Sequence, residues 1–123
     1  MLPSAPRDQR LRRSDRLRKT AAYQRCYRLG RRRSGRFLLL YTVPGASPTL
    51  FGQTASRKVG GAVVRHRLKR WGREVFRRFA GRDQLPGGDL VVHFRPEAAR
   101  ANFADFARDL EQQLRLLLPR EPK

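Results

Sequence analysis

Apolar residues recur at helical spacing through a strongly basic stretch between Gly61 and Phe79. At 100° per residue, five of them fall on one narrow stripe of an amphipathic helix, namely Val64, Leu68, Trp71, Val75 and Phe79. Basic residues cover most of the remainder, and four follow one another at i, i+4 spacing beside the stripe: Arg65, Lys69, Arg73 and Arg77. The pattern predicts a helix with one face in a core and positive charge over the rest. Gly72 costs such a helix about 1 kcal/mol relative to alanine, so we expect close packing between helix and sheet there.

Two further helices are predicted from the same spacing and from end signals. Thr20 can cap a helix that runs to Leu29, with Gly30 as its stop. Asn102, followed three residues later by Asp105, is typical of a helix start. The apolar stripe of that last helix consists of Phe103, Phe106, Ala107, Leu110, Leu114 and Leu117.

Short apolar runs between the helices predict strands at 37–43, 50–58 and 89–95, bounded by proline and glycine. Residues 31–36 form a charged connection that includes a short edge strand. The order helix, strands, helix, strand, helix indicates an α+β or split α/β fold, with the helices on one face of a small sheet.

Charge divides the chain into blocks. Residues 1–36 carry thirteen basic and two acidic residues, 37–56 none, 57–82 ten and one, and 83–123 six and seven. We therefore expect a flexible basic arm over 1–16, one α+β domain over 17–118 that binds nucleic acid, and a short tail over 119–123. A net charge of +19 on 123 residues indicates a nucleic-acid partner, and the excess of arginine over lysine suits bidentate contact with phosphate.

Cysteine usage and hydropathy indicate the cellular compartment of the protein. The single cysteine, Cys26, excludes an internal disulfide and a cysteine-based zinc site. No apolar run approaches the length of a membrane span, and no apolar signal core follows the basic N-terminus. We expect a cytoplasmic protein without a membrane partner and without an obligate protein partner.

The sequence offers no catalytic constellation. Most acids lie in the closing segment, and the two histidines are isolated. We expect His93, in the middle of a strand, to be packed or solvated, and Cys26 to be a small buried hydrophobe. No protein side chain is expected to be catalytic or to bind a metal.

Basic and aromatic residues together give the stronger signal. Tyr23 and Tyr27 share a helical face with Cys26, and Tyr41 lies on the apolar strand at 37–43. Aromatic rings edged by arginine hold single-stranded nucleic acid with little sequence preference. The alternative is that the rings belong to the core, but phenol groups favour a half-exposed cleft.

The segment 56–76 (SRKVGGAVVRHRLKRWGREVF) resembles the signature of the protein subunit of bacterial ribonuclease P. That family has a serine and a basic pair, a glycine, and an Arg-Asn-Arg run that opens a basic helix. Residues 17–30, 38–41 and 89–98 resemble its first helix, its apolar strand, and its last strand and turn, so the resemblance covers about 17–117. His66 stands where the family has asparagine, so we expect an altered contact there, and Gly61 and Gln53 depart as well.

The resemblance implies an α-β-β-β-α-β-α fold of the kind found in domain 2 of ribosomal protein S5, a small twisted sheet of about four strands with three helices and a left-handed crossover. It also implies an accessory subunit of an endoribonuclease that removes the 5′ leader of precursor tRNA, with Mg²⁺ and the active site in the RNA subunit. Tyr23, Tyr27 and Tyr41 would line the leader cleft. The ribonuclease P RNA would meet the basic motif of Arg57, Lys58, Arg65, His66, Arg67, Lys69, Arg70 and Arg73.

Three other interpretations share some of these features. A structural RNA-binding protein of the ribosomal type would have the same charge. A DNA-binding protein could place the basic helix in a major groove, and a nuclease could act without RNA. Stimulated cleavage of precursor tRNA by ribonuclease P RNA separates the ribonuclease P interpretation from the structural RNA-binding protein. Tighter binding to duplex DNA than to RNA would favour the DNA-binding protein, and cleavage by the protein without RNA would indicate the nuclease.

Overall fold

Strand β4 (Gly88–Phe94) lies at the centre of the fold. The computed structural model describes residues 11–119, so the first ten residues of the predicted arm and the last four of the predicted tail lie outside the described residues. β4 pairs antiparallel with β2 (Leu38–Pro44) and parallel with β3 (Thr49–Thr54), and β1 (Arg31–Ser34) adds to the free side of β2. The resulting mixed sheet has the order β1-β2-β4-β3.

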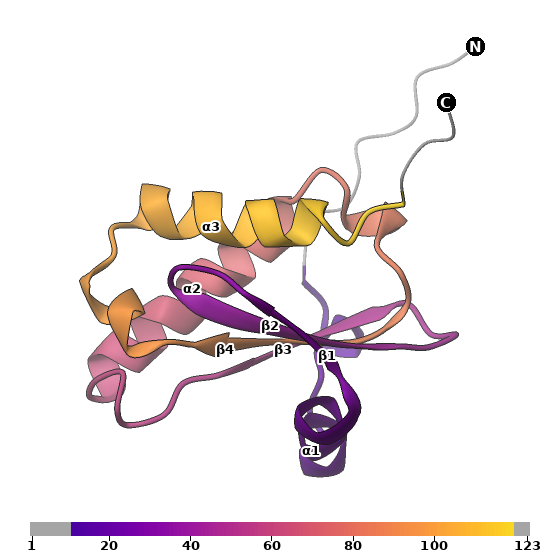
Figure 1. Cartoon of the computed structure of the whole chain (residues 1–123), viewed down its shortest axis with the longest axis horizontal. Helices are drawn as coiled ribbons and strands as arrows, with labels where there is room; N and C mark the ends of the chain where they lie inside the picture. Colours follow the sequence, from indigo (N-terminus) through magenta and orange to yellow (C-terminus); the bar gives the residue numbers. More distant parts are fainter. Residues whose placement is uncertain (1–10, 120–123) are drawn as a thin grey trace.

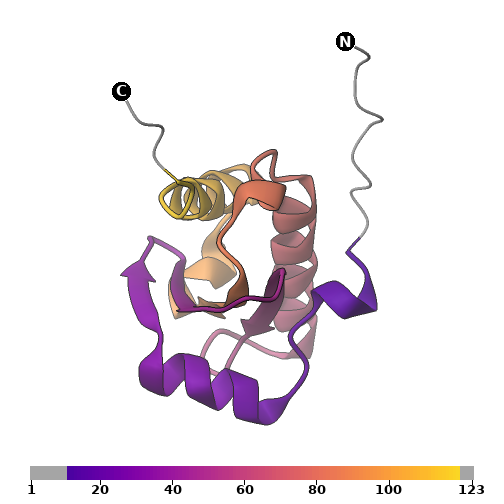
Figure 2. The same ribbon diagram turned by 90° about the vertical axis from the view of Figure 1, so that its right-hand side faces the viewer.

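The three α-helices of the described chain cover both faces of this sheet. α2 (Ala62–Arg78) and α3 (Phe103–Arg115) lie on one face, and α1 (Thr20–Leu29) lies on the other (Figures 1 and 2). The α+β class and the element order are confirmed. The prediction that all helices share one face is wrong, because α1 closes a second, smaller apolar cluster around Leu17, Cys26, Val43 and Val91.

The main core lies between the sheet and the pair α2 and α3. Alternate residues of β4, among them Leu90, Val92 and Phe94, point into it, as expected from the period of two along a strand. Phe106, Leu110 and Leu114 of α3 are fully buried against them. Phe103, predicted for the same stripe, is 41% exposed because it begins the helix beyond the edge of the core.

The amphipathic stripe of α2 is confirmed, and the buried face is wider than predicted. Leu68 and Val75 are buried as expected, and Phe76 joins them by stacking on Phe51 of β3, with ring centroids 4.3 Å apart. Gly72 lies close to the sheet: a Cβ atom there would meet the side-chain oxygen of Gln53 at 1.8 Å. The Gln53 side chain fills the space beside Gly72 and donates to the Lys69 carbonyl at 3.0 Å. The position without a side chain therefore accommodates a side chain of β3, and the expected close approach of helix and sheet stays a prediction.

Element ends follow local chemistry. The strand predicted over 50–58 ends at Thr54, and the chain turns over 57–59 before α2 begins. Gly30 ends α1 as predicted, donating its N–H to the Cys26 carbonyl at 2.9 Å. The predicted cap at Thr20 is wrong, because Thr20 is the first helical residue and Lys19 holds the N-cap position without a side-chain hydrogen bond. Asn102 caps α3 as predicted, since its side-chain oxygen accepts from the Asp105 N–H at 2.8 Å.

Residues 11–16, the described part of the predicted arm, run along the outer edge of β3. They include a 3-10 turn, η1 (Arg13–Asp15). Arg16 forms a parallel bridge with Phe51, and the Leu17 N–H donates to the Phe51 carbonyl at 2.9 Å. Asp15 also forms an ion pair with Arg82 at 3.3 Å. The boundary between arm and domain at residue 17 stays a prediction.

No helix within residues 11–119 combines the length and apolar character needed to cross a bilayer.

Asp109 ties α3 to the loop that joins β1 and β2. Its two carboxylate oxygens accept from the backbone N–H groups of Arg36 at 3.1 Å and Phe37 at 2.9 Å. These two donors therefore find their partner on an element more than seventy residues away. We expect this contact to contribute more to the free energy of unfolding than a surface ion pair does.

Asp109→Ala should lower the free energy of unfolding by about 1–3 kcal/mol, because two backbone donors lose a charged acceptor. Asp109→Asn should lose less, since it retains one oxygen acceptor. The control is Glu111→Ala, which removes only an exposed pair with Arg115 at 3.4 Å and should change stability by less than about 0.5 kcal/mol. Urea unfolding measures all three, and equal losses for Asp109→Ala and Glu111→Ala would contradict the assignment.

Candidate nucleic-acid interface

Three aromatic rings from three elements meet on the α1 side of the sheet. Tyr27 of α1 lies with its ring centroid 4.8 Å from that of Tyr41 on β2 and 5.7 Å from that of His93 on β4. Tyr41 and His93 are 6.4 Å apart, and all three pairs are edge-on. Tyr27 is 38% exposed, and Tyr41 and His93 are half-buried. We call Tyr27, Tyr41 and His93 the aromatic cluster.

A polar network fixes one side of this cluster. His93 Nδ1 lies 3.1 Å from the Tyr27 hydroxyl and 2.9 Å from the Thr54 hydroxyl, and the two hydroxyls are also hydrogen-bonded to each other. Burial lowers the pKa of His93 and raises that of Tyr27. The imidazole therefore favours its neutral form within the network.

His93 and Thr54 were missed as site residues by the sequence reasoning. Alternation along β4 places His93 on the face opposite Val92, and this placement can be predicted from the sequence. The pairing of His93 with Thr54 depends on the register between β4 and β3, which no local pattern reveals. The expectation that His93 is packed or solvated holds only in part, because its ring packs inside the aromatic cluster and is also hydrogen-bonded there.

Tyr23 is held differently from Tyr27 and Tyr41. Its hydroxyl donates to the Leu17 carbonyl at 3.0 Å and accepts from the Gln53 N–H at 3.3 Å. The ring lies over Gly52, where a Cβ atom would meet the Tyr23 hydroxyl oxygen at 2.6 Å. Tyr23 therefore links α1 and the segment before it, at Leu17, to β3. Its hydroxyl already has two backbone partners.

Cys26 is fully buried in the smaller apolar cluster, as predicted. Burial raises the pKa of its thiol to about 11. A thiol of that kind is almost wholly protonated near neutral pH and is a poor nucleophile.

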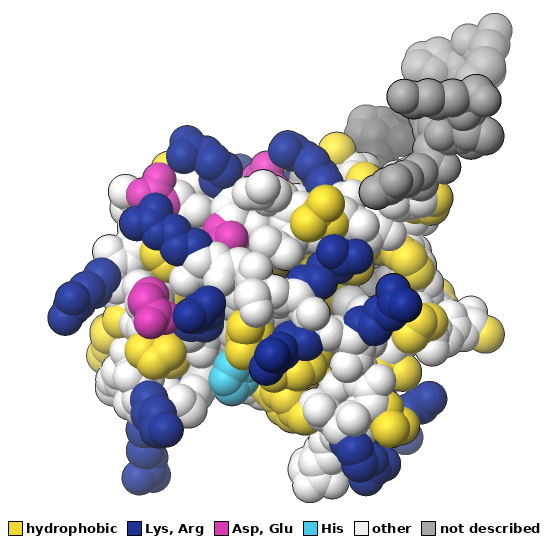
Figure 3. All heavy atoms as spheres, viewed as in Figure 1, with side chains coloured by type: hydrophobic (Ala, Val, Ile, Leu, Met, Phe, Trp, Pro, Cys, Tyr) yellow, Lys and Arg dark blue, Asp and Glu magenta, His cyan; other side chains and the backbone are white. Residues whose placement is uncertain are grey.

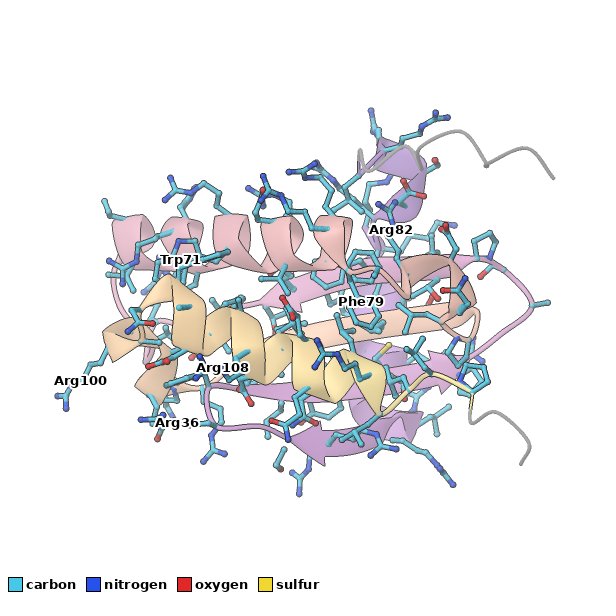
Figure 4. The ribbon with its side chains drawn as sticks, turned by 90° about the horizontal axis from the view of Figure 1, so that it is seen from above. Arg36, Trp71, Phe79, Arg82, Arg100 and Arg108 are labelled. Atoms are coloured by element: carbon cyan, nitrogen blue, oxygen red, sulfur yellow. The ribbon has the colours of Figure 1, made fainter. Side chains whose placement is uncertain are left out.

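The exposed side of α2 presents the basic motif. Basic side chains project outward along its length, away from α3 (Figure 4). His66 and Arg70 are exposed, and Arg67 and Arg73 are partly buried. Together with Ala62 and Val63, these four residues line a shallow hollow of about 670 Å³. Lysine and arginine also dominate the charged groups on the face shown in Figure 3.

Arg67 is partly engaged within the protein. It donates to the Ala99 carbonyl at 3.1 Å, and its guanidinium carbon lies 5.3 Å from the centre of the Trp71 ring. Such a cation–π contact holds the side chain against the surface. Among the predicted basic residues, Arg70 and His66 are consequently freer than Arg67 to meet a ligand.

The N-terminal segment adds further cations beside α2. A second hollow, of about 570 Å³, lies between this segment, β3 and α2. Burial and the nearby charges of Arg16 and Arg70 lower the pKa of Arg73, which borders this hollow. The lining residues within 11–119 include no carboxylate, so an anion bound there would reduce the repulsion among the cations. Its basic lining residues are Arg13, Arg16, Arg18, Lys69 and Arg73.

The predicted site residues fall into separate surfaces. Arg65 lies partly buried on α2, with its Nε atom buried and unpartnered among the described residues. Arg57 and Lys58 are exposed in the turn before α2, and Lys58 lines a hollow that it shares with His93. The structure thus brings Lys58 toward the aromatic cluster, although the sequence grouped it with the basic helix.

The donor set on these surfaces does not suit a metal ion. Mg²⁺ takes oxygen ligands, chiefly carboxylates, carbonyls and water. Within residues 11–119, no three His, Cys, Asp or Glu side chains gather in a way that could hold a metal. Glu74, the acid on α2, is already paired with Arg77 and Arg78, each at 2.7 Å, and the Arg77 hydrogen bond lowers the pKa of its carboxyl.

Comparison with known proteins gives one consistent family. The model of the family described as Ribonuclease P matches residues 11–117. The ribonuclease P protein component of Thermus scotoductus is 44% identical over 94 residues, which are 76% of this chain and 54% of that protein. The corresponding protein of Desulfovibrio desulfuricans is 39% identical over 106 residues, 83% of this chain and 79% of its own length.

A solved structure of the RNase P protein of Staphylococcus aureus superposes with a TM-score of 0.77 at 27% identity, covering 85% of this chain and 98% of that one. The chain therefore belongs to the ribonuclease P protein family. It spans about half the length of the Thermus relative.

The buried imidazole gives a pH-dependent prediction. Because the pKa of His93 is lower in the folded chain than its ordinary value of about 6.5, the neutral ring stabilises the fold above that pH. This contribution is lost as the pH falls and protons bind the unfolded chain preferentially. A leucine at position 93 cannot bind a proton, so His93→Leu should not lose stability in this way as the pH falls.

As the pH is lowered from 7 to 5, the free energy of unfolding of the wild type should therefore fall more than that of His93→Leu. Urea unfolding at several pH values measures both, and the pair at pH 8 gives the pH-independent cost of the substitution. A difference that stays constant over this range would show that His93 titrates alike in the folded and unfolded chain.

Proposed function

We propose that the chain is the protein subunit of a ribonuclease P ribonucleoprotein, which hydrolyses one phosphodiester of precursor tRNA and releases the 5′ leader. The observation that carries the proposal is the pairing of two surfaces on one small domain. The aromatic cluster lies on the α1 side of the sheet, and the basic face of α2 lies on the other. Family membership supports an RNA subunit as the partner and precursor tRNA as the substrate.

The aromatic cluster suits a single-stranded leader. Tyr27 and Tyr41 present partly exposed ring surface, and stacking of bases on aromatic rings is tolerant of sequence. The hydroxyl network with Thr54 and His93 holds Tyr27 in place before RNA arrives. A preorganised ring loses little side-chain entropy on binding. Tyr23 supports the cluster by fixing α1 on β3.

The basic face of α2 suits the folded RNA subunit. Arginine donates in a planar fork that matches phosphate oxygens, and a row of such groups neutralises closely spaced phosphates. His66 lies within this row and can donate or accept a hydrogen bond, as the asparagine of the family can. The basic residues proposed for this contact are Arg57, Arg65, Arg67, Lys69, Arg70 and Arg73, whereas Lys58 lies at the hollow beside His93.

The catalytic Mg²⁺ is proposed to be held by the RNA subunit. When bound, the metal supplies an activated water and charge stabilisation at the scissile phosphate. The protein's part is to hold the leader on one side and to lower the repulsion between RNA phosphates on the other. We place this assembly in the cytoplasm, with the RNA subunit and precursor tRNA as partners.

The proposal is tested by reconstitution. Adding the protein to bacterial ribonuclease P RNA at low Mg²⁺ should accelerate cleavage of precursor tRNA at the mature 5′ end, because basic side chains replace part of the metal's screening. A structural RNA-binding protein would bind without acceleration. Cleavage by the protein alone would indicate a nuclease of its own, and tighter binding to duplex DNA than to RNA would favour a DNA-binding role.

Tyr27→Ala in the holoenzyme should weaken binding of leader-bearing precursor by about 1–3 kcal/mol, the value of one lost base stack. Mature tRNA, which has no leader, should bind as before. Tyr27→Phe is the matched comparison: it keeps the ring and should lose less than Tyr27→Ala, and the part that it loses reports the hydroxyl contacts with Thr54 and His93. Equal losses on precursor and on mature tRNA would contradict the cleft assignment.

Arg70→Ala should reduce the slope of log affinity against log salt by about one unit for the RNA subunit. Arg70 is exposed and lines the hollow on α2. The control is Arg108→Ala on α3, whose side chain is exposed and lies 3.6 Å from Asp105. Filter binding at several salt concentrations measures both slopes, and a slope that Arg70→Ala leaves unchanged would remove Arg70 from the interface.

A further inference from the structure

The aromatic cluster opens onto a polar hollow that the proposed function leaves unassigned. The hollow has a volume of about 340 Å³. Its floor includes one row of residues that runs across the sheet, because Ser34 pairs with Leu39 and Leu39 pairs with His93. α1 packs over Val43 and Val91, farther along the strands, so this row is left partly open.

The groups around this hollow are mainly hydrogen-bond donors. Arg32 and Lys58 are exposed, Arg95 lines the same space, and Ser34 and Ser56 add hydroxyls. The lining residues within 11–119 include no carboxylate. Arg95 is already oriented, since it donates to the Gly35 carbonyl at 3.0 Å and lies 3.4 Å from Glu97. Donors of positive charge with hydroxyls beside them fit an acceptor-only anion such as a phosphodiester.

His93 is the residue that joins the hollow to the aromatic cluster. Its Nδ1 atom faces the hydroxyls of Tyr27 and Thr54. We assign Nδ1 as the acceptor, because a phenol is a better donor than a neutral imidazole, and the proton then resides on Nε2. Nε2 makes no hydrogen bond with the residues that the structure describes, so its N–H is available to a ligand.

We infer that this hollow is a phosphate subsite of the leader cleft, in which the His93 Nε2–H donates to a phosphodiester oxygen next to the nucleotide stacked on Tyr27 and Tyr41. The inference rests on the proposed function, since it names a contact within the same cleft. His93 is thereby a binding residue whose orientation is set by Tyr27 and Thr54. Lys58 and Arg32 supply the charge that favours a phosphate over a neutral group at that position.

The occupant is single-stranded RNA because the site combines two elements in one place. Partly exposed rings stack bases, and donors immediately beside them bind the backbone. A free anion would use the donors alone and would gain nothing from the rings. The coupling between base stacking and phosphate binding is therefore what an experiment should detect.

The experiment measures binding of precursor tRNA to the reconstituted holoenzyme, with Ca²⁺ in place of Mg²⁺ to suppress cleavage. Each leader phosphate is replaced in turn by an uncharged methylphosphonate. In the wild type, one position should lose about tenfold in affinity, the value of a hydrogen bond to a charged group. In His93→Leu the unmodified precursor should already bind about tenfold more weakly. The same methylphosphonate should then cost less than in the wild type, since only the contribution of Lys58 and Arg32 is left to lose.

A matched pair of variants separates the hydrogen bond from packing. The amide nitrogen of His93→Gln reaches the position of Nε2, whereas that of His93→Asn reaches only the position of Nδ1. Gln should restore most of the affinity and the penalty at the sensitive phosphate, and Asn should restore neither. Since both are polar and smaller than histidine, a difference between them keeps the test decisive even if His93→Leu folds poorly.

The outcomes distinguish the two levels of the proposal. If the wild-type holoenzyme binds leader-bearing and mature tRNA alike, the proposed function fails. If it prefers the leader but every methylphosphonate costs the wild type and His93→Leu equally, the proposed function stands and the phosphate subsite is overturned. Equal affinities of the Gln and Asn variants would likewise overturn it.

Discussion

The burial of one face of α2 against the sheet is the contact on which the rest of the molecule depends. Arg65, Lys69, Arg73 and Arg77 stand at i, i+4 spacing, and each such pair of like charges costs about 0.2–0.5 kcal/mol. Glu74 offsets only the last turn, where it pairs with Arg77 and Arg78. Against this, each large apolar side chain buried under the helix contributes about 1.5–3 kcal/mol. Leu68, Val75 and Phe76 therefore outweigh the repulsion, and the helix can carry more charge than it would tolerate alone.

The same packing decides where the chain can meet its ligands. Because α2 and α3 close one face of the sheet, the other face is left to α1, a helix of ten residues. α1 seals only the end of that face near Val43 and Val91. The row through Leu39 and His93 stays partly open, with Tyr27 and Tyr41 along its border. The cleft thus follows from a helix too short to cover the sheet.

Much of the fold was legible in the sequence wherever the signal was local. The period of α2, the Asn102 cap and the end of α1 at Gly30 each depend on neighbouring residues and were predicted. The side of the sheet on which α1 lies was not, because helical periodicity shows which residues share a face and not what covers that face. The strand over 50–58 was predicted too long, since a turn at 57–59 leaves only weak traces in composition.

In the candidate site, too, local features were predicted from the sequence and long-range contacts were not. Tyr27 and Tyr41 were predicted as cleft residues because aromatic residues beside arginines form a compositional signal, and the structure brings their rings together. His93 and Thr54 were missed because their link to Tyr27 passes through the register of β4 on β3. Lys58 was grouped with α2 by its place in the chain, yet the turn before α2 carries it to the hollow beside His93. Residues close in sequence can be separated by a turn, and a motif alone does not show which surface each member joins.

The separation of the two surfaces has a consequence for how the domain can vary. His66 lies on the exposed side of α2, and His93 lies on the opposite face of the sheet with the packed layers of the domain between them. Substitutions at sites without shared contacts act independently unless a rigid element or a common ligand couples them. Within the protein, the surface proposed for the RNA subunit and the cleft proposed for the leader can therefore change separately. We therefore expect energetic coupling between His66 and His93 to pass through the RNA that the two surfaces are proposed to hold.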